Sequence, residues 1–254
     1  MTDSQLQAHA ASFGAVAAEY DRARPSYPAA VFDAIERLTG RPLKGADVLD
    51  VGAGTGIATR LLHERGARVT AVEPSAGMAA RLHAVSPRIA LVKGDGNDLP
   101  FHDATADLIT YAQAFHWTDP ARSIPEALRV LRPGGALALI WNLKDRSVGW
   151  LRAQEERLTA ALPSYHYYGA MNVVIEALGD YPFEVSRTEL RWERRLTVDD
   201  VITDLRSKSY FAVLDEDRKG PVLAAERAAL LEVFPDGEVV EPYSVDLTVA
   251  VKCG

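Results

Sequence analysis

The sequence predicts an α/β fold built on a parallel sheet, and three observations predict it. Apolar runs of strand length alternate with helical patterns between residues 47 and 141. The run 47–51 is followed at once by glycines at 52, 54 and 56, which is the layout of a nucleotide pocket in an open sheet. Strands separated by helices imply right-handed crossover connections, which leave neighbouring strands parallel.

The expected elements follow in order along the chain. Residues 4–22 fit an amphipathic helix that the prolines at 25 and 28 interrupt, and a second helix is expected over about 29–38. The expected strands of the sheet are 47–51, 68–73, 88–93, 106–111 and 135–141. The helices expected between them are about 57–65, 76–84 and 120–131. The run Arg132-Pro133-Gly134-Gly135 predicts a turn before the fifth strand.

The pattern changes after Trp141. The helices expected there are 149–161, 172–178, 198–206 and 216–233, with an aromatic loop over 163–169. Two long strands are expected over 183–192 and 239–251, the second from its alternating apolar residues. We predict a single domain over residues 1–254, with a core of about 41–142 and 183–254. The expected cap and substrate elements are about 1–40, 143–180 and 197–220.

Composition limits the class of protein. The 254 residues are 48% hydrophobic and 25% charged, as in soluble globular proteins, and no apolar run approaches the ~20 residues of a membrane span. Cys253 is the only cysteine, and residues 1–10 do not resemble a signal peptide, so we expect a cytoplasmic protein. A net charge of −7 argues against a nucleic-acid partner. We expect a monomer or homodimer.

Polar groups stand where the predicted strands end, which is the edge where open α/β sheets bind ligands. Asp50 ends the first strand, and Glu73 ends the second about 20 positions later, where an acid can accept hydrogen bonds from ribose hydroxyls. Met78, in the next helix, can lie against an adenine ring. Asp95 follows the third strand and can accept from an adenine amine. The fourth strand ends in a polar and aromatic run, 111–117.

Several of these segments together resemble the class I S-adenosylmethionine-dependent methyltransferases, and notably their type 11 small-molecule group. The matching segments are VLDVGAGTGIATRLL (48–62), VEPSAGM (72–78), GDGNDLPF (94–101), YAQAFHW (111–117) and EALRVLRPGGALALIWN (126–142). The upstream run 20–28 is similar to that of a bacterial subgroup. The resemblance implies a Rossmann-like sheet, mostly parallel with an antiparallel C-terminal strand, plus a helical cap.

The resemblance also implies a cofactor site for S-adenosylmethionine, with S-adenosylhomocysteine as its product. The glycines 52, 54 and 56 would line the methionine moiety above Asp50, and Glu73 would bind the ribose. Asp95, Gly96 and Asn97 would hold the adenine, while Gln113 would lie beside the methionine amine. The full expected cofactor set is Arg24, Tyr27, Asp50, Gly52, Ala53, Gly54, Gly56, Glu73, Pro74, Met78, Asp95, Gly96, Asn97, Gln113 and Phe115. Arg24 and Tyr27 would close over the cofactor carboxylate, since a guanidinium pairs well with a carboxylate.

Methyl transfer to an oxygen or nitrogen requires that the acceptor lose a proton, and a neutral histidine can take it. His116 is the first candidate, with packing between Phe115 and Trp117 as the alternative. His166 is the second, and its loop could instead form an aromatic wall or a surface turn. The residues expected at the acceptor are Trp117, Trp141, Tyr165, Tyr168 and Tyr210, although aromatic residues are more often core. We expect selectivity to reside in the N-terminal helices, 143–180 and 197–220, the last of which contains the run 206–211.

The resemblance favours methyl transfer to a small molecule, such as a hydroxyl or carboxylate of a sugar, lipid or phenol. A nicotinamide-dependent oxidoreductase is one alternative, but it predicts a different glycine spacing, Gly-x-Gly-x-x-Gly. A non-catalytic protein that binds S-adenosylmethionine is the other. No cluster has metal-ligand spacing, so we expect a metal-independent enzyme.

Overall fold

The computed structural model describes residues 24–162, 176–208, 211 and 214–254. The expected helix over 4–22, the aromatic loop and most of the expected helix over 172–178 lie outside these ranges. None of the helices within them is both long and apolar enough to cross a lipid bilayer.

The chain divides into two compact units. The sheet unit comprises Ser26–Asn142, Gly169–Leu190 and Val245–Gly254. The helical unit comprises Met1–Pro25, Leu143–Tyr168 and Arg191–Ser244. This division differs from the expected core and cap, because 29–39 falls in the sheet unit and because 191–196 and 221–244 fall in the helical unit. That the two units form one methyltransferase domain remains a prediction.

One seven-stranded sheet has the order β3-β2-β1-β4-β5-β7-β6. Its first five strands are β1 (Asp47–Val51), β2 (Arg68–Val72), β3 (Ala90–Val92), β4 (Ala106–Ala112) and β5 (Leu131–Lys144). All the pairings among these five are parallel, with Val51 beside Val72 and Asp50 beside Thr110. The strand order reverses between β1 and β4, so the ends of these two strands flank the expected binding crevice.

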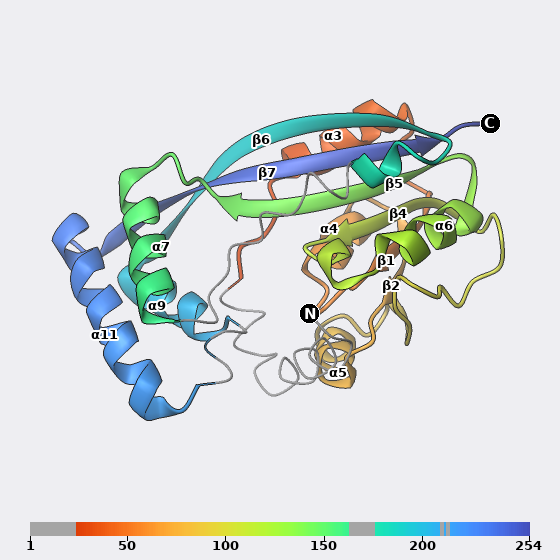
Figure 1. Cartoon of the computed structure of the whole chain (residues 1–254). Helices are drawn as coiled ribbons and strands as arrows, with labels where there is room; N and C mark the ends of the chain where they lie inside the picture. The colour runs from red at the N-terminus through yellow and green to blue at the C-terminus, as the bar shows by residue number, and fades with distance from the viewer. Residues whose placement is uncertain (1–23, 163–175, 209–210, 212–213) are drawn as a thin grey trace. The chain divides into compact units, whose positions relative to one another are not determined.

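The last two strands, β6 (Phe183–Thr197) and β7 (Glu238–Lys252), are long and antiparallel to each other. In the sheet unit Cys253 N donates to Pro182 O at 2.9 Å, and in the helical unit Val198 N donates to Gly237 O at 3.0 Å. Figure 1 shows β5, β7 and β6 running side by side. The expectation of a mostly parallel sheet with an antiparallel C-terminal strand is confirmed.

The helices of the sheet unit that flank its parallel strands are α3 (Ala29–Thr39), α4 (Ile57–Glu64), α5 (Ala76–Val85) and α6 (Pro120–Val130). Each presents an apolar face to the core; in α3 this face is formed by Val31, Phe32 and Ile35. Gly40, at φ 65°, ends α3 in a left-handed conformation that glycine adopts readily. Asp119 begins α6 by accepting a hydrogen bond from Ala121 N at 3.0 Å.

Among the described residues, the helical unit contains α7 (Gly149–Ala161), α9 (Val198–Arg206) and α11 (Glu216–Val233). Helix α11 packs against both α7 and α9. Their shared core is apolar and contains Leu158, Val201, Phe211 and Leu230, none more than 2% exposed. A capping box between Thr197 and Asp200 fixes where α9 begins.

Two strands extend further than the sequence predicts. Strand β5 begins at Leu131 rather than 135, but its pairing with β4 jumps from Leu131 to Ala136, so the turn signal at 132–135 becomes an irregularity within the strand. Strand β6 continues to Thr197 rather than 192. It is the last strand of the sheet and has no fully buried residue, so charged residues fit along its end.

Candidate functional site

The glycine loop after β1 adopts a conformation that other residues rarely adopt. Gly52, Gly54 and Gly56 have φ angles of 68°, 58° and 85°. A Cβ at Gly52 would lie 2.5 Å from the Cβ of Ala114, and one at Gly56 would lie 2.9 Å from Cγ of Leu82. No described atom lies within 4 Å of a Cβ at Gly54. Two glycines therefore allow close packing, while Gly54 borders open space.

Asp50, near the end of β1, stabilises the start of this loop. It is 1% exposed, and its carboxylate accepts hydrogen bonds from the hydroxyls of Thr59 at 2.5 Å and Thr110 at 2.7 Å. Burial raises the pKa of Asp50, and these two hydrogen bonds partly offset that rise. The carboxylate thus joins the end of β1 to α4 and to β4, a supporting role at the base of the loop.

Glu73, directly after β2, holds the glycine loop through its backbone. Gly54 N donates to one carboxylate oxygen and Ser75 N donates to the other, both at 2.8 Å. Glu73 is 6% exposed, and burial raises its pKa while the two amides lower it. A carboxylate offers about four acceptor positions, so two remain for further donors such as ribose hydroxyls. The sequence predicted the acid but not its bonds to the loop.

The turn after β3 is tight and fixed at both ends. Asp95 is exposed, and its Oδ1 accepts from Asn97 N at 2.7 Å. The side-chain oxygen of Asn97 accepts from Asp119 N at 2.8 Å, which ties the turn to the start of α6. A Cβ at Gly96 would lie 2.5 Å from the Tyr111 hydroxyl, so only glycine fits there.

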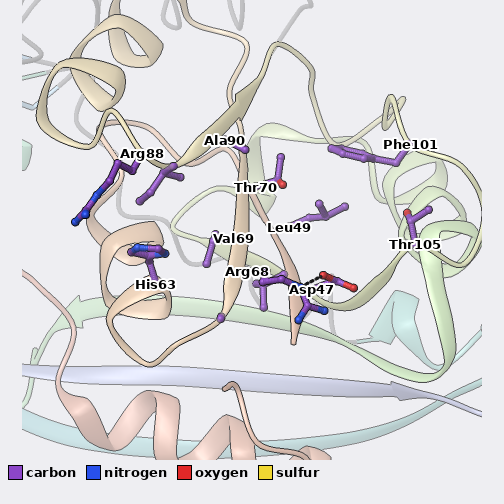
Figure 2. A pocket seen from close by; sticks show the side chains of 13 residues that line it. Asp47, Leu49, His63, Arg68, Val69, Thr70, Arg88, Ala90, Phe101 and Thr105 are labelled. Carbon is purple, nitrogen blue, oxygen red and sulfur yellow. Dashed lines mark hydrogen bonds and ion pairs between the residues drawn. The ribbon is translucent and has the colours of Figure 1, made fainter. Parts of the chain in front are cut away.

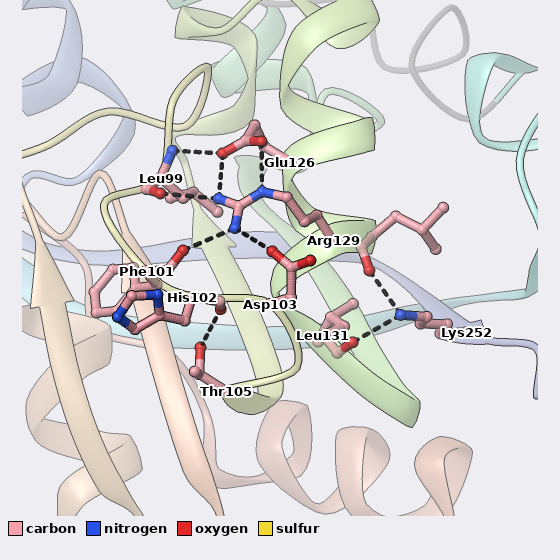
Figure 3. A network of polar contacts seen from close by, with 10 residues as sticks. Leu99, Phe101, His102, Asp103, Thr105, Glu126, Arg129, Leu131 and Lys252 are labelled. Carbon is pink, nitrogen blue, oxygen red and sulfur yellow. Dashed lines mark hydrogen bonds and ion pairs between the residues drawn. The ribbon is translucent and has the colours of Figure 1, made fainter.

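Arg129 of α6 clamps the loop that follows this turn, as Figure 3 shows. Its guanidinium donates to the carbonyls of Leu99 and Phe101 and to the carboxylates of Asp103 and Glu126, at 2.8–3.1 Å. Glu126 in turn accepts from Leu99 N at 2.9 Å. The sequence analysis did not identify this clamp. Its only local signal is the spacing of Glu126 and Arg129 on one helix face.

The end of β4 is held in a strained conformation. Gln113 has φ 57°, which is uncommon for a residue other than glycine and marks strain of the kind found at functional sites. Its side-chain amide donates to Asn142 O at 2.6 Å, and its backbone N donates to Ile140 O at 2.8 Å. Asn142 is buried and donates to Ser26 O at 3.1 Å. This chain of bonds, which the sequence analysis missed, links the ends of β4 and β5 to the segment before α3.

The aromatic residues after β4 divide by exposure. Phe115 is fully buried and packs edge-on against Tyr111, with ring centroids 5.0 Å apart. Trp141 is 2% exposed, so it forms part of the core. His116 and Trp117 are half-buried, with ring centroids 5.0 Å apart. Burial lowers the pKa of His116 to about 4, so its imidazole is neutral at pH 7.

The remaining predicted residues fall in different parts of the structure. Met78 is 5% exposed and packs in the sheet unit, whereas Pro74 is exposed. Tyr27 belongs to the sheet unit and is half-buried. Arg24 belongs to the helical unit, where its charge acts on Asp204 and Lys208. His166, Tyr165, Tyr168 and Tyr210 lie outside the described residues.

A cavity of about 420 Å³ in the sheet unit is distinct from this site. Asp47, Leu49, Arg68, Arg88 and Phe101 are among its lining residues (Figure 2). Asp47 and Arg68 begin β1 and β2, so the cavity lies at the amino ends of these strands, while ligands of open α/β sheets bind at the carboxyl ends. Within the described ranges, no three His, Cys, Asp or Glu side chains are grouped so that they could hold a metal ion.

Comparison with known proteins assigns the chain and its fold to one family. A family model described as a methyltransferase domain matches residues 49–139, which include the glycine loop and Glu73. An uncharacterised methyltransferase of Mycobacterium tuberculosis, Rv3342, is 39% identical over 209 residues, which are 78% of this chain and 77% of the relative. A malonyl-[acyl-carrier protein] O-methyltransferase of Serratia marcescens is 32% identical over 93% of this chain and 94% of its own.

Solved structures agree with these relatives. A protein from Anaeromyxobacter dehalogenans, provisionally assigned as a type II methyltransferase, has a TM-score of 0.68 and 25% identity over 91% of this chain and 97% of its own. A phosphoethanolamine N-methyltransferase of Haemonchus contortus shares the fold, with a TM-score of 0.56 and 15% identity over 95% of this chain and 58% of its own. The chain is a methyltransferase that belongs to the class I S-adenosylmethionine-dependent family.

Proposed function

We propose that this protein transfers a methyl group from S-adenosylmethionine to an oxygen of a small-molecule acceptor. The acceptor atom would belong to a hydroxyl or a carboxylate of a sugar, lipid or phenolic metabolite. The observation that carries the proposal is the glycine loop. Gly54 borders open space at the carboxyl end of β1, and Glu73 holds its backbone from the end of β2.

The residues at this edge fit the donor. Gly52, Ala53, Gly54 and Gly56 would surround its methionine part, with the backbone free of bulky side chains. Glu73 would accept from the ribose hydroxyls with the acceptor positions that its amide bonds leave. Asp95 and Asn97, both with accessible surface, would meet the adenine, and Gln113 would lie near the methionine amine.

When bound, S-adenosylmethionine supplies a methyl group that its sulfonium already activates, so the protein mainly contributes position and a dry site. A neutral His116 would accept the proton that a hydroxyl acceptor loses. A carboxylate acceptor has no proton to lose and would need only orientation. His116 is thus required for one acceptor class and dispensable for the other.

One comparison supports transfer to oxygen, and a second one concerns only the donor. The relative from Serratia marcescens is named an O-methyltransferase, and it matches nearly the whole chain at 32% identity. The Haemonchus contortus enzyme was solved with S-adenosylhomocysteine bound. We also propose that the protein is cytoplasmic, acts without a nucleic-acid partner and is a monomer or homodimer.

A labelled-methyl transfer screen tests the proposal most broadly. Purified protein and methyl-labelled S-adenosylmethionine are incubated with matched sugars, fatty acids and phenols, and each product is analysed by mass spectrometry. We expect label on oxygen in at least one class. Label found only on nitrogen or carbon would contradict the proposed chemistry. His116→Gln should abolish transfer to hydroxyls while S-adenosylhomocysteine still binds, and full activity of that variant would rule out His116 as an obligatory base.

A further inference from the structure

Asn142, near the end of β5, joins two distant segments of the sheet unit. Its backbone carbonyl accepts a hydrogen bond from Gln113 Nε2 at 2.6 Å, and its side-chain Nδ2 donates to Ser26 O at 3.1 Å. Asn142 is 6% exposed, so its amide lies where the loss of a partner is costly. Ser26 and Asn142 are the first and last residues of one continuous stretch of the sheet unit, and their bond holds these two ends together.

Gln113 lies next to the glycine loop. The residue that follows it, Ala114, is so close to Gly52 that a Cβ at Gly52 would lie 2.5 Å from the Cβ of Ala114. Gln113 N donates to Ile140 O at 2.8 Å, and the backbone of Gln113 has φ 57°. A residue other than glycine keeps such a conformation only where its surroundings hold it, and strained residues of this kind gather at functional sites. Gln113 is therefore held, at a cost, beside the loop that is proposed to bind the donor.

The bond to Asn142 decides which end of the Gln113 amide a ligand meets. A backbone carbonyl can only accept hydrogen bonds, so the NH2 group of the Gln113 amide must face Asn142 O. The amide oxygen, Oε1, is then left for other donors. It receives no hydrogen bond from the described residues, and it is not fully enclosed. Gln113 thus offers an acceptor to a ligand, and a ligand group that donates hydrogen bonds fits it.

We propose that Asn142 is a positioning residue for the methyl donor and that it acts through Gln113. Its carbonyl turns the Gln113 amide so that Oε1 accepts from the ammonium group of the donor's methionine part. The bond from its side chain to Ser26 holds Asn142, and therefore its carbonyl, in place. This inference rests on the proposed function, because it assumes that the glycine loop binds that methionine part. An ammonium group has three donors and no acceptor, and hydrogen bonds from a charged donor are the strong ones.

The test compares two ligands that share a nucleoside. S-adenosylhomocysteine carries the ammonium group, whereas methylthioadenosine has the same nucleoside and sulfur but lacks the amino-acid part. Calorimetry gives the dissociation constant of each ligand for the full-length wild-type protein and its variants. The ratio of the two constants reports what the amino-acid part contributes to binding. A variant that merely loosens the fold weakens both ligands and leaves this ratio unchanged.

Two single variants should reduce the preference for S-adenosylhomocysteine. Gln113→Met removes the acceptor and should weaken S-adenosylhomocysteine about tenfold, the loss expected for one charge-assisted hydrogen bond, with methylthioadenosine unchanged. Asn142→Leu removes the donor to Ser26 and should change the ratio in the same direction by about threefold, as for one neutral hydrogen bond. If Asn142→Leu does not fold, Asn142→Ser replaces it, because the serine hydroxyl ends one bond closer to the backbone.

A double variant and a control show whether the effect passes through Gln113. In the Gln113→Met background, Asn142→Leu should change the ratio no further, since residues of one network do not act additively. Two independent, additive losses would contradict the proposed route. Gln154→Met is the matched control, because Gln154 is a buried amide of the helical unit that donates to Glu226 at 3.3 Å. It should lower the thermal unfolding midpoint and leave the ratio unchanged, and an equal change of the ratio in this control would overturn the proposal.

The same titrations keep the two proposals apart. If the wild-type protein binds neither ligand, the proposed function fails. If it binds S-adenosylhomocysteine and all variants keep the wild-type ratio, only the role of Asn142 fails. If Gln113→Met changes the ratio while Asn142→Leu and Asn142→Ser do not, Gln113 meets the ammonium group without the help of Asn142, and the inference is again overturned.

Discussion

The glycine loop and the charged cluster of the helical unit, which includes Lys144, Arg194, Lys208, Asp204 and Glu241, are built in different ways. The loop is formed by backbone: three glycines with positive φ and the amide of Gly54, which Glu73 holds. The cluster is formed by charged side chains that three strands and one helix bring together. A backbone site suits a ligand that is the same in every member of a family, and a side-chain site can change by single substitutions. The glycine loop thus suits the role proposed for it, the binding of a constant methyl donor.

The largest expected effect tests the packing of the loop. Gly52→Ala should reduce the free energy of unfolding by about 3 kcal/mol, because it adds a clash with Ala114 to an unfavourable φ. Gly237→Ala is the matched control, since Gly237 has φ 78° and no described atom within 4 Å of its Cβ. That control should lose only about 1 kcal/mol. Chemical denaturation measures both, and equal losses would contradict the tight contact at Gly52.

The next effect concerns Arg129, which holds the loop at Leu99 and Phe101. Arg129→Met should cost about 2 kcal/mol of unfolding free energy, because it leaves two carbonyls and two carboxylates without this donor at a partly exposed site. Binding of S-adenosylhomocysteine should weaken as well. Arg122→Met, on an exposed position of the same helix, should change neither quantity. If Arg129→Met behaves like this control, the clamp has no role in shaping the site.

An effect of similar size is expected on the pH dependence of the free energy of unfolding. The folded-state pKa of His116 is lowered to about 4, so the unfolded chain binds a proton that the folded chain excludes. Above pH 6.5 the imidazole is neutral in both states, so this residue does not lower the free energy of unfolding. As the pH decreases toward 4, proton binding by the unfolded chain lowers that free energy by on the order of 2 kcal/mol. His116→Gln should flatten that part of the stability profile, whereas His102→Gln, at an exposed position, should not. An unchanged slope in His116→Gln would contradict the burial of this imidazole.

The smallest expected effect concerns the donor's ribose. Glu73→Gln keeps the shape of the side chain but lacks one of its two acceptor oxygens, so the free energy of S-adenosylhomocysteine binding should weaken by about 1 kcal/mol. Glu64→Gln, at an exposed position of α4, is the control. Calorimetry measures both affinities. An unchanged affinity in Glu73→Gln would remove the ribose role assigned to Glu73.

Local patterns predicted the sheet and the glycine loop because their signals lie close together in the sequence. The glycine spacing and the acid at each strand end need only a few neighbouring residues to be recognised. The pairs that local patterns could not predict join distant segments: Gln113 with Asn142, Arg129 with Leu99, and Lys144 with Glu241. The sequence did indicate 206–211 as a selectivity segment, but the partners of Lys208 depend on the fold.

The end of strand β6 is another feature that local sequence patterns could not predict. Its predicted end at Trp192 was wrong because the next residues, Glu193, Arg194 and Arg195, are charged and interrupt the apolar pattern. In the structure Arg194 lies opposite Glu241 on β7 and pairs with it, while Trp192 stacks on Tyr243 with ring centroids 5.1 Å apart. A charge that appears to end a strand is accommodated when the neighbouring strand supplies its counter-charge.

The central claim is that the glycine loop holds the methyl donor, and Gly54 tests it most directly. S-adenosylhomocysteine is titrated by calorimetry into the wild-type protein, Gly54→Ala and Gly237→Ala, with NAD titrated into the wild-type protein as a control. Both substitutions place a Cβ at a positive φ with no described atom within 4 Å, so their effects on stability should match. We predict that the wild-type protein and Gly237→Ala bind S-adenosylhomocysteine and that Gly54→Ala does not. Equal binding by all three proteins, or binding of NAD alone, would contradict the claim.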